Sequence, residues 1–144
     1  MIVKFKKLDN RAVIPEYATE QAAGFDVRAV LDEPVTLQCL ERKLFNAGFA
    51  IELPVGYEAQ VRPRSGLALK HGLSIVNAPG TIDADYRGPV GVILVNLSNE
   101  PYTIQPNERI AQIVIAKHEH ADLVEVSELN DTERGAGGFG STGK

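Results

Sequence analysis

Short apolar runs recur along the chain, and Pro or Gly residues separate most of them. The runs are IVKF, VTLQCL, FAIEL, YEAQV, LSIV, VGVILVNL, YTIQ, RIAQIVIA and LVEV. Many short runs between turn residues are typical of an antiparallel sandwich, barrel or jelly roll. Only residues 65–71 (SGLALKH) favour a helix, of about two turns. The pattern therefore predicts an all-β, jelly-roll-like sandwich or barrel with one short helix.

Two runs, at 90–97 and 110–116, are almost continuously apolar. A strand of an antiparallel sheet with one solvated face would instead alternate apolar and polar residues. Either these strands are central and covered on both faces, or their outer face contacts another subunit. The pattern leaves both interpretations open.

The composition is that of an ordinary soluble domain, with 144 residues, 44% apolar and 24% charged. A formal net charge of -4 argues against general binding to nucleic acid or to an anionic membrane surface. The single cysteine, Cys39, excludes an intrachain disulfide and a multi-cysteine zinc site, and fits a reducing compartment. With no long apolar segment and no apolar signal core near the N-terminus, we expect a cytoplasmic protein.

The composition changes after Leu129. Residues 130–144 contain five glycines and one large apolar side chain, Phe139. Such a segment cannot bury enough apolar surface to offset the entropy lost on ordering. We therefore predict one β-domain over 1–129 and a flexible, Gly-rich C-terminal segment over 130–144.

This C-terminal segment contains a misleading motif. Residues 135–140 match the dinucleotide pattern G-x-G-x-x-G, but that pattern binds phosphate only where a helix follows it, and no helix-forming stretch does. Two interpretations remain open. The segment has no role, or it closes over a nucleotide, with Phe139 stacking on a base and Arg134 pairing with phosphate near the Ser141 hydroxyl.

The connection at 77–88, NAPGTIDADYRG, carries more chemistry than a turn needs. Besides Pro, Gly and Asn, it holds two carboxylates at alternate positions, Asp83 and Asp85, followed by Tyr86. On an extended backbone the two carboxylates point one way and the tyrosine points the other way. A hairpin of this kind could hold a flat polar ligand and activate a water beside it.

Two further segments each allow two interpretations. Ser65, after Arg64, is either the N-cap of the short helix or, with Arg64, part of an anion cradle. Asp26 is either a solvated carboxylate or one linked to magnesium, since hard cations prefer oxygen ligands. His118 and His120 share one side of a strand, but no third metal ligand is near them, which favours a solvated pair.

Taken together, five segments resemble the motifs of the trimeric deoxyuridine triphosphate nucleotidohydrolases (dUTPases), in the family's order. They are AGFDVRA at 23–29, RPRSGLALKHG at 62–72, NAPGTIDADYRG at 77–88, ERIAQIVI at 108–115 and RGAGGFGSTG at 134–143. The resemblance implies a jelly-roll-like domain and a homotrimer with shared active sites. It also implies magnesium-assisted hydrolysis of dUTP to dUMP and pyrophosphate, which lowers dUTP and supplies dUMP for dTMP synthesis.

The resemblance also implies roles for individual residues. Asp83 would be the general base that deprotonates the water attacking the α-phosphorus, and Tyr86 would pack under the deoxyribose. The residues expected to read the uracil edge are Asn77, Gly80, Thr81 and Ile82. Those expected near the phosphates are Arg64, Ser65, Gly66 and Gln112, with Asp26 holding magnesium through water. Those expected to form the closing lid are Arg134, Phe139, Gly140 and Ser141.

Gly91 departs from the family pattern, because relatives often carry a longer side chain there. Contacts at this position are then expected from the main chain alone.

Two other functions have to be distinguished from dUTP hydrolysis. A dCTP deaminase shares this fold but usually has a longer chain and a glutamate beside the base, whereas Asp83 and Tyr86 fit the hydrolase. A catalytically idle dUTP sensor is disfavoured by the intact Asp83 and lid.

Overall fold

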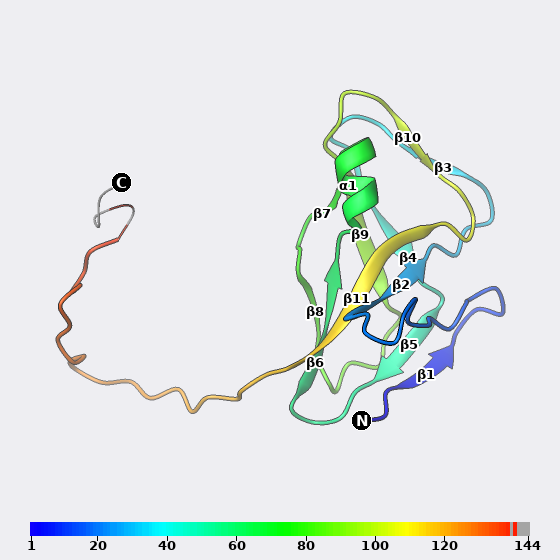
Figure 1. Cartoon of the computed structure of the whole chain (residues 1–144). Helices are drawn as coiled ribbons and strands as arrows, with labels where there is room; N and C mark the ends of the chain where they lie inside the picture. The colour runs from blue at the N-terminus through cyan, green and yellow to red at the C-terminus, as the bar shows by residue number, and fades with distance from the viewer. Residues whose placement is uncertain (139, 141–144) are drawn as a thin grey trace.

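The protein is described by a computed structural model covering residues 1–138 and 140. It is a β-structure with a single short helix (Figure 1), as the sequence predicts. The first strands are β1 (Lys4–Lys7), β2 (Gly24–Arg28), β3 (Val35–Leu37), β4 (Arg42–Asn46), β5 (Phe49–Glu52) and β6 (Tyr57–Arg62). After the helix α1 (Ser65–His71) come β7 (Leu73–Ile75), β8 (Gly80–Ile82), β9 (Gly91–Asn96), β10 (Tyr102–Ile104) and β11 (Arg109–Lys117).

The strands form two main sheets, ordered β2-β11-β6-β8 and β4-β9-β7. Two smaller ribbons, β1-β5 and β10-β3, complete the barrel-like body, and every strand pair is antiparallel. The largest fully buried apolar side chains come from several of these sheets, including Leu37, Phe45, Phe49, Leu73, Leu94 and Ile113. The body therefore has one core shared by all the sheets, as a jelly-roll-like domain requires.

The two apolar runs alternate between buried and half-exposed positions in the fold. In β9, Val92 and Leu94 are buried while Ile93 and Val95 are half-buried. In β11, Ile113 is buried and Val114 is half-buried. The chain's own elements therefore do not cover both faces of these strands. The second interpretation, a subunit contact on the outer face, stays a prediction.

Asn96, at the end of β9, is the one buried polar residue in the described part of the chain, with 0% of its surface exposed. Its amide nitrogen donates to the carbonyl oxygens of Leu37 and Glu100, and its side-chain oxygen accepts from Ser98. All the hydrogen-bonding groups of this buried side chain are thus satisfied. Asn96 ties the end of β9 to β3 and to the turn that leads into β10.

The helix α1 starts differently from the prediction. Ser65 is the first helical residue rather than the N-cap; the cap is Arg64, whose backbone is extended and whose side chain makes no capping bond. The Arg64 side chain cannot accept a capping hydrogen bond from the free amides, because a guanidinium group has no acceptor atom. The helix ends at Gly72, which has φ 64° and whose amide donates to Ala68. The N-cap interpretation of Ser65 is therefore wrong.

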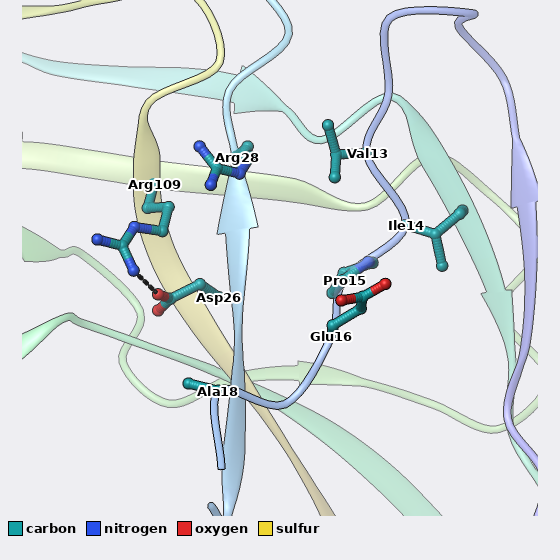
Figure 2. Close-up of a pocket in the computed structure, with 8 residues that line it drawn as sticks. All are labelled: Val13, Ile14, Pro15, Glu16, Ala18, Asp26, Arg28 and Arg109. Atoms are coloured by element: carbon teal, nitrogen blue, oxygen red, sulfur yellow. Dashed lines mark hydrogen bonds and ion pairs between the residues drawn. The ribbon is translucent and has the colours of Figure 1, made fainter.

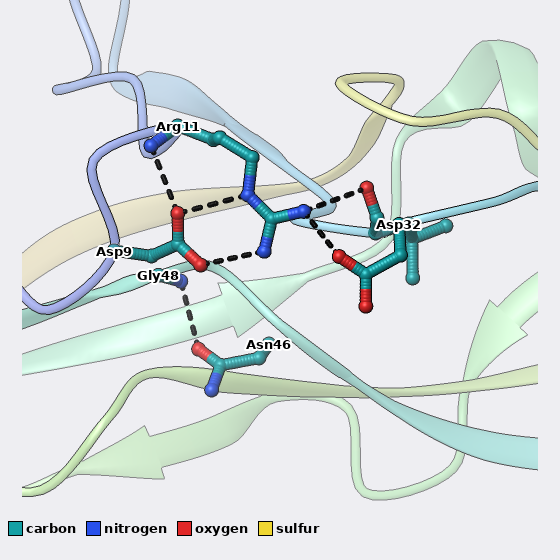
Figure 3. Close-up of polar contacts among 6 residues, drawn as sticks. Asp9, Arg11, Asp32, Asn46 and Gly48 are labelled. Carbon is teal, nitrogen blue, oxygen red and sulfur yellow. Dashed lines mark hydrogen bonds and ion pairs between the residues drawn. The ribbon is translucent and has the colours of Figure 1, made fainter.

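The N-terminal segment before β2 is held to the body by an ion-pair cluster (Figure 3). The Arg11 guanidinium donates to Asp9 at 2.7 Å and to Asp32 at 2.6 Å. The hydrogen bonds from the Arg11 side chain are the main reason why the pKa of Asp9 falls to about 2. The amides of Leu8 and Asp9 also donate to the carbonyl of Gly48. These contacts hold the chain just before the loop at residues 13–18.

Beyond β11 the chain leaves the body as an extended arm, residues 118–138 (Figure 1). The predicted strand LVEV, at 123–126, does not form, because no other described strand lies beside it to share backbone hydrogen bonds. Leu123 is 94% exposed and Leu129 is 87% exposed. The division at residue 129 stays a prediction. No helix of the described residues is long and apolar enough to span a membrane.

Candidate functional site

The segment 77–91 contains β8 and the turn that leads to β9, two strands that belong to different sheets. It lies beside a cavity of about 340 Å³, here called the hairpin pocket after the hairpin that the sequence predicts. One side of the pocket is lined by hairpin residues Asn77, Thr81, Ile82, Asp83 and Tyr86. The other side is lined by Leu44, Pro89, Val90, Gly91 and Ile93. The hairpin is positioned because β8 pairs with β6 on one side and the chain returns into β9 on the other. Most residues expected to contact the nucleoside are therefore brought together.

The tyrosine of the hairpin is held by its own loop. A Cβ atom on Gly88 would collide with the Tyr86 hydroxyl group, so the ring packs directly over Gly88. The Tyr86 hydroxyl donates to the carbonyl of Pro89 at 3.2 Å. Arg87 donates to the carbonyls of Ala84 and Tyr86 at 2.6 and 3.0 Å. These contacts fix the position of the half-exposed ring at the edge of the pocket.

Asn77 lies against the start of β8. Its Nδ2 atom is 3.1 Å from the position that a Cβ of Gly80 would take. A side-chain amide offers both a donor and an acceptor, and the nearby main chain adds more of each. The absence of a side chain at Gly80 thus lets Asn77 and the β8 backbone present polar groups together. This arrangement can read the edge of a flat polar ring.

Asp83 follows β8 directly and lies at the pocket with an exposed side chain. Within residues 1–138 and 140 its carboxylate takes part in no hydrogen bond or ion pair. A carboxylate without competing partners can accept a proton from a bound water. Asp85 is also exposed but does not line the pocket. The structure thus distinguishes the two carboxylates that the sequence pattern left equivalent.

A second group, here called the arginine cluster, consists of Asp26, Arg64, Arg109 and Gln112. One oxygen of Asp26 accepts from Arg64 Nε at 3.0 Å, and the other accepts from Arg109 Nη1 at 3.0 Å (Figure 2 shows the second bond). Arg64 also donates to the carbonyl of Arg109 at 3.1 Å. Asp26 therefore holds two guanidinium groups side by side, and both remain partly exposed.

Gln112 occupies the centre of this group. In the register of the sheet it lies between Asp26 on β2 and Arg62 on β6. Its amide donates to the carbonyl of Pro63 at 2.9 Å, which fixes the residue before Arg64. Ser65 is exposed beside the cluster, and a Cβ on Gly66 would meet no atom within 4 Å. The space over this segment is therefore open to a ligand.

A cavity of about 270 Å³ lies next to the arginine cluster (Figure 2). Asp26, Arg28 and Arg109 face it from the sheet, and the loop at 13–18 supplies the opposite wall. Arg28 donates to the carbonyl of Asn107 at 2.7 Å. The sequence predicts no role for Arg28, whereas Arg109 is one of several arginines beside polar breaks that suit a local anion site. The signal for Arg109 was weak, because a β-bulge between Arg109 and Ala111 sets its direction, and bulges leave no mark on a hydrophobic pattern.

The donor set fits magnesium only in an indirect way. The described residues contain no group of three His, Cys, Asp or Glu side chains that could hold a metal ion. Asp26 is one carboxylate, and two arginines already contact both of its oxygens. Magnesium keeps several water ligands and is commonly bound by one or two carboxylates and substrate phosphates. The site therefore fits a magnesium ion held by a polyphosphate, with Asp26 nearby.

The hairpin pocket and the arginine cluster lie apart within one chain. The pairing of Ile82 with Ala59, continued by one residue, sets Asp83 opposite Glu58. At about 3.3 Å per residue, Arg64 is then about 20 Å further along β6 and its extension. No hydrogen bond or ion pair among the described residues joins the two groups. Asp83 and Arg64 of the same chain thus cannot contact one phosphate group.

The residues expected to form a lid are only partly described. Arg134 lies on the arm and donates to the carbonyl of Gly137 at 2.8 Å, within its own turn. Gly140 is exposed with φ 88°. Phe139 and Ser141 lie outside the described residues. Arg134 is therefore not in contact with the hairpin pocket or the arginine cluster.

Comparison with known proteins agrees with this geometry. The chain is similar to the deoxyuridine 5'-triphosphate nucleotidohydrolase of Nautilia profundicola, at 57% identity over 144 residues that cover both chains fully. That of Cytophaga hutchinsonii is 61% identical over 142 residues, covering 99% of this chain and 92% of the relative. A solved dUTPase of Staphylococcus bacteriophage 80alpha with dUpNHpp matches with a TM-score of 0.88, at 29% identity and 99% coverage of each chain. The dUTPase family model matches residues 10–143, and the chain therefore belongs to the dUTPase family.

Proposed function

We propose that this chain hydrolyses dUTP to dUMP and pyrophosphate, with Asp83 as the general base for a magnesium-assisted attack of water on the α-phosphorus. The observation that carries the proposal is the free Asp83 carboxylate at the mouth of the hairpin pocket. In the reaction, the water oxygen bonds to the α-phosphorus and a water proton passes to Asp83. The bond from the α-phosphorus to the bridging oxygen breaks, and pyrophosphate leaves.

The hairpin pocket supplies recognition of the nucleoside. Asn77 and the main chain of Gly80, Thr81 and Ile82 bind the uracil edge, while the Tyr86 ring packs against the deoxyribose. Uracil and cytosine differ at C4, so a polar edge paired for uracil would be left unpaired by cytosine. A site with buried polar groups can discriminate by about 10⁴ on this basis. The close approach of Asn77 to the Gly80 backbone supports this assignment.

The arginine cluster supplies binding of the phosphates. Arg64, Ser65 and Gly66 contact phosphate oxygens, and Gln112 lies close to the phosphates or the attacking water. Magnesium bound to the triphosphate would neutralise phosphate charge, and Asp26 would hold it indirectly, through its water ligands. Phosphoryl transfer depends mainly on positioning and electrostatic stabilisation, which a pair of fixed guanidinium groups provides. The open space over Gly66 supports the approach of phosphate.

The functional unit that we propose is a homotrimer with shared sites. The hairpin pocket of one copy faces the arginine cluster of another, because the two groups of one chain lie too far apart. The half-exposed apolar side chains on the outer faces of β9 and β11 support such a contact. So does the exposed arm, residues 118–138, which leaves the body beyond β11. The lid of Arg134, Phe139, Gly140 and Ser141 then closes over the bound nucleotide of another copy.

The proposal is tested by incubating the protein with each dNTP in the presence of magnesium and identifying the products. We expect dUMP and pyrophosphate from dUTP, with dCTP and UTP as poor substrates. Release of a deaminated nucleotide from dCTP would favour the deaminase, and binding of dUTP without turnover would favour a sensor. Light scattering should give about three times the 15.6 kDa chain mass, and a fully active monomer would exclude shared sites. The exposed free cysteine of the chain, Cys39, fits a reducing compartment such as the cytoplasm.

A further inference from the structure

Leu44 lies on the outer face of β4, outside all five segments that resemble the family motifs. Its side chain is 71% exposed, although it is large and apolar. A single exposed leucine is common on protein surfaces and carries no meaning by itself. The position of Leu44 carries the argument, because this residue also lines the hairpin pocket.

The side chain of Leu44 occupies the space that a side chain at position 91 would need. β4 pairs with β9, with Leu44 opposite Ile93 and Asn46 opposite Gly91. A Cβ atom on Gly91 would lie 2.7 Å from Leu44 Cδ1. Gly91 is not among the glycines with positive φ, so its backbone would accept a side chain. A side chain at 91 would therefore have to move the end of the exposed Leu44 side chain out of the place that it occupies.

That place belongs to the wall of the hairpin pocket. Gly91 and Leu44 both line the cavity, together with Asp83 and Tyr86. Because Gly91 has no side chain, this part of the wall would be bare backbone if Leu44 did not cover it. The Leu44 side chain covers it with branched aliphatic carbon instead. The expectation that Gly91 itself offers only main-chain contacts stays a prediction, and the neighbouring strand places the Leu44 side chain beside it.

We propose that Leu44 is a substrate-binding residue, which forms the apolar wall of the hairpin pocket in the place left by Gly91. The inference rests on the proposed function, since it takes the nucleoside of dUTP as the occupant of this pocket. The nucleoside packs against Leu44 both before and during the reaction, whereas Asp83 acts on the water. Leu44 therefore contributes equally to binding of the ground state and of the transition state, which lowers KM and leaves kcat unchanged.

The test compares Leu44→Ala, Gly91→Met and the double variant by steady-state hydrolysis of dUTP. Small changes in a hydrophobic pocket alter binding by about 10–200-fold, and at this open edge we expect Leu44→Ala to raise KM about tenfold at constant kcat. In the double variant the Met side chain fills the vacated place, and KM should return to within about threefold of wild type. Gly91→Met alone should raise KM, because two side chains then compete. This non-additivity is the signature of a shared place.

Val55→Ala is the matched control. Val55 lies on the turn between β5 and β6, is 95% exposed and does not line the hairpin pocket. We expect its KM to equal that of wild type, and light scattering should show the same assembly for all variants. Titration with dUMP in a calorimeter gives a second measure of binding, and Leu44→Ala should weaken it about as much as it raises KM.

The inference would be overturned if Leu44→Ala had the KM and dUMP affinity of wild type, or if its only effect were loss of the assembly or a lower unfolding temperature. A fall in kcat at constant KM would also contradict it. Failure of the proposed function looks different. In that case the wild-type protein itself would not convert dUTP to dUMP, whatever residue stands at position 44.

Discussion

The hairpin pocket and the arginine cluster are built by different means. The hairpin pocket is held by contacts within a short stretch of chain, such as Tyr86 over Gly88 and Arg87 on its neighbouring carbonyls. The arginine cluster is held by ion pairs between residues distant in sequence, with Asp26 binding both Arg64 and Arg109. The hairpin pocket thus presents largely neutral groups in a fixed shape. The arginine cluster presents guanidinium groups that are paired with the Asp26 carboxylate.

The difference follows from what each group has to bind. A base is flat and neutral, so fixed backbone donors and acceptors can select it without the entropy cost of ordering long side chains. Phosphates are highly charged, and free arginines would repel each other before the substrate arrives. Asp26 supplies a counter-charge that keeps both guanidinium groups in place. We therefore expect changes in the hairpin pocket to affect selectivity and chemistry, and changes in the cluster to affect phosphate binding.

The largest expected effect is that of Asp83→Asn. An amide cannot take the proton from water, so turnover should fall by about 10²–10⁴, the usual contribution of a positioned general base. Binding of a non-hydrolysable dUTP analogue, measured by calorimetry, should be kept. The control is Asp85→Asn, which changes an exposed carboxylate outside the pocket and should leave turnover nearly unchanged. Equal losses in the two variants would mean that the general negative charge of the hairpin matters, and not the position of Asp83.

The next largest effect distinguishes the arginine cluster from the hairpin pocket directly. Arg64→Gln should weaken binding of the dUTP analogue about 10–100-fold, since a hydrogen bond to a charged group is worth about 1.5–3 kcal/mol. Binding of deoxyuridine, which has no phosphate, should not change. Added salt should likewise weaken binding of the analogue more than that of deoxyuridine, because screening acts on charges. If deoxyuridine binding fell equally, the distinction between neutral recognition and charge binding would be lost.

A smaller effect is expected from Gly88→Ala. The added Cβ would collide with the Tyr86 hydroxyl group and force the ring to move. Overpacking of this kind costs about 1–3 kcal/mol, and we expect KM for dUTP to rise about tenfold. Tyr86→Phe is the control, because it removes only the bond to Pro89 and keeps the ring in place. A larger defect in Tyr86→Phe than in Gly88→Ala would show that the hydroxyl, and not the ring position, is what the pocket needs.

The smallest effect concerns the Arg11 cluster, which serves the fold and lies outside both binding groups. The folded-state pKa of Asp9 is about 2, against 3.8 as its ordinary value. The ionised form is thus favoured in the folded state, and this stabilisation is present above about pH 4 and lost as the pH falls towards 2. Arg11→Gln should lower the unfolding temperature at pH 7, and the difference from wild type should vanish near pH 2. Thermal unfolding at several pH values measures this, and kcat at pH 7 should not change.

Local pattern predicted much of the fold. Turn residues between short apolar runs indicated the β-architecture, and SGLALKH indicated the helix, because these signals lie within a few residues of each other. The predicted strand at 123–126 is absent, since a strand needs a partner that local sequence does not specify. The residue type of Ser65 allows it to be an N-cap or part of an anion cradle, whereas the start of the helix is set by the extended backbone at Arg64.

The residue pattern alone indicates the part of the candidate site whose residues are close in sequence, whereas Asp26, Arg64 and Gln112, which meet across strands, are linked only by the family resemblance. The hairpin from Asn77 to Tyr86 is one continuous segment, so its chemistry could be recognised directly. The contact between Leu44 and Gly91 depends on the pairing of β4 with β9, and the bond from Arg109 to Asp26 depends on a bulge in β11. Strand registers and bulges follow from the packing of the whole domain, so they cannot be predicted from local patterns in a single sequence.

The burial of Asn96 has a practical consequence for producing this protein. Asn96, Leu97 and Ser98 form an acceptor sequence for N-linked sugar, which is attached only in a secretory pathway. The fold needs this side chain fully enclosed, with its amide nitrogen donating to Leu37 and Glu100. A sugar attached to that nitrogen before folding would not fit in the enclosed space around the Asn96 side chain. Glycosylation at this site and native folding therefore exclude each other, and a host that keeps the chain in its cytosol is the one to choose.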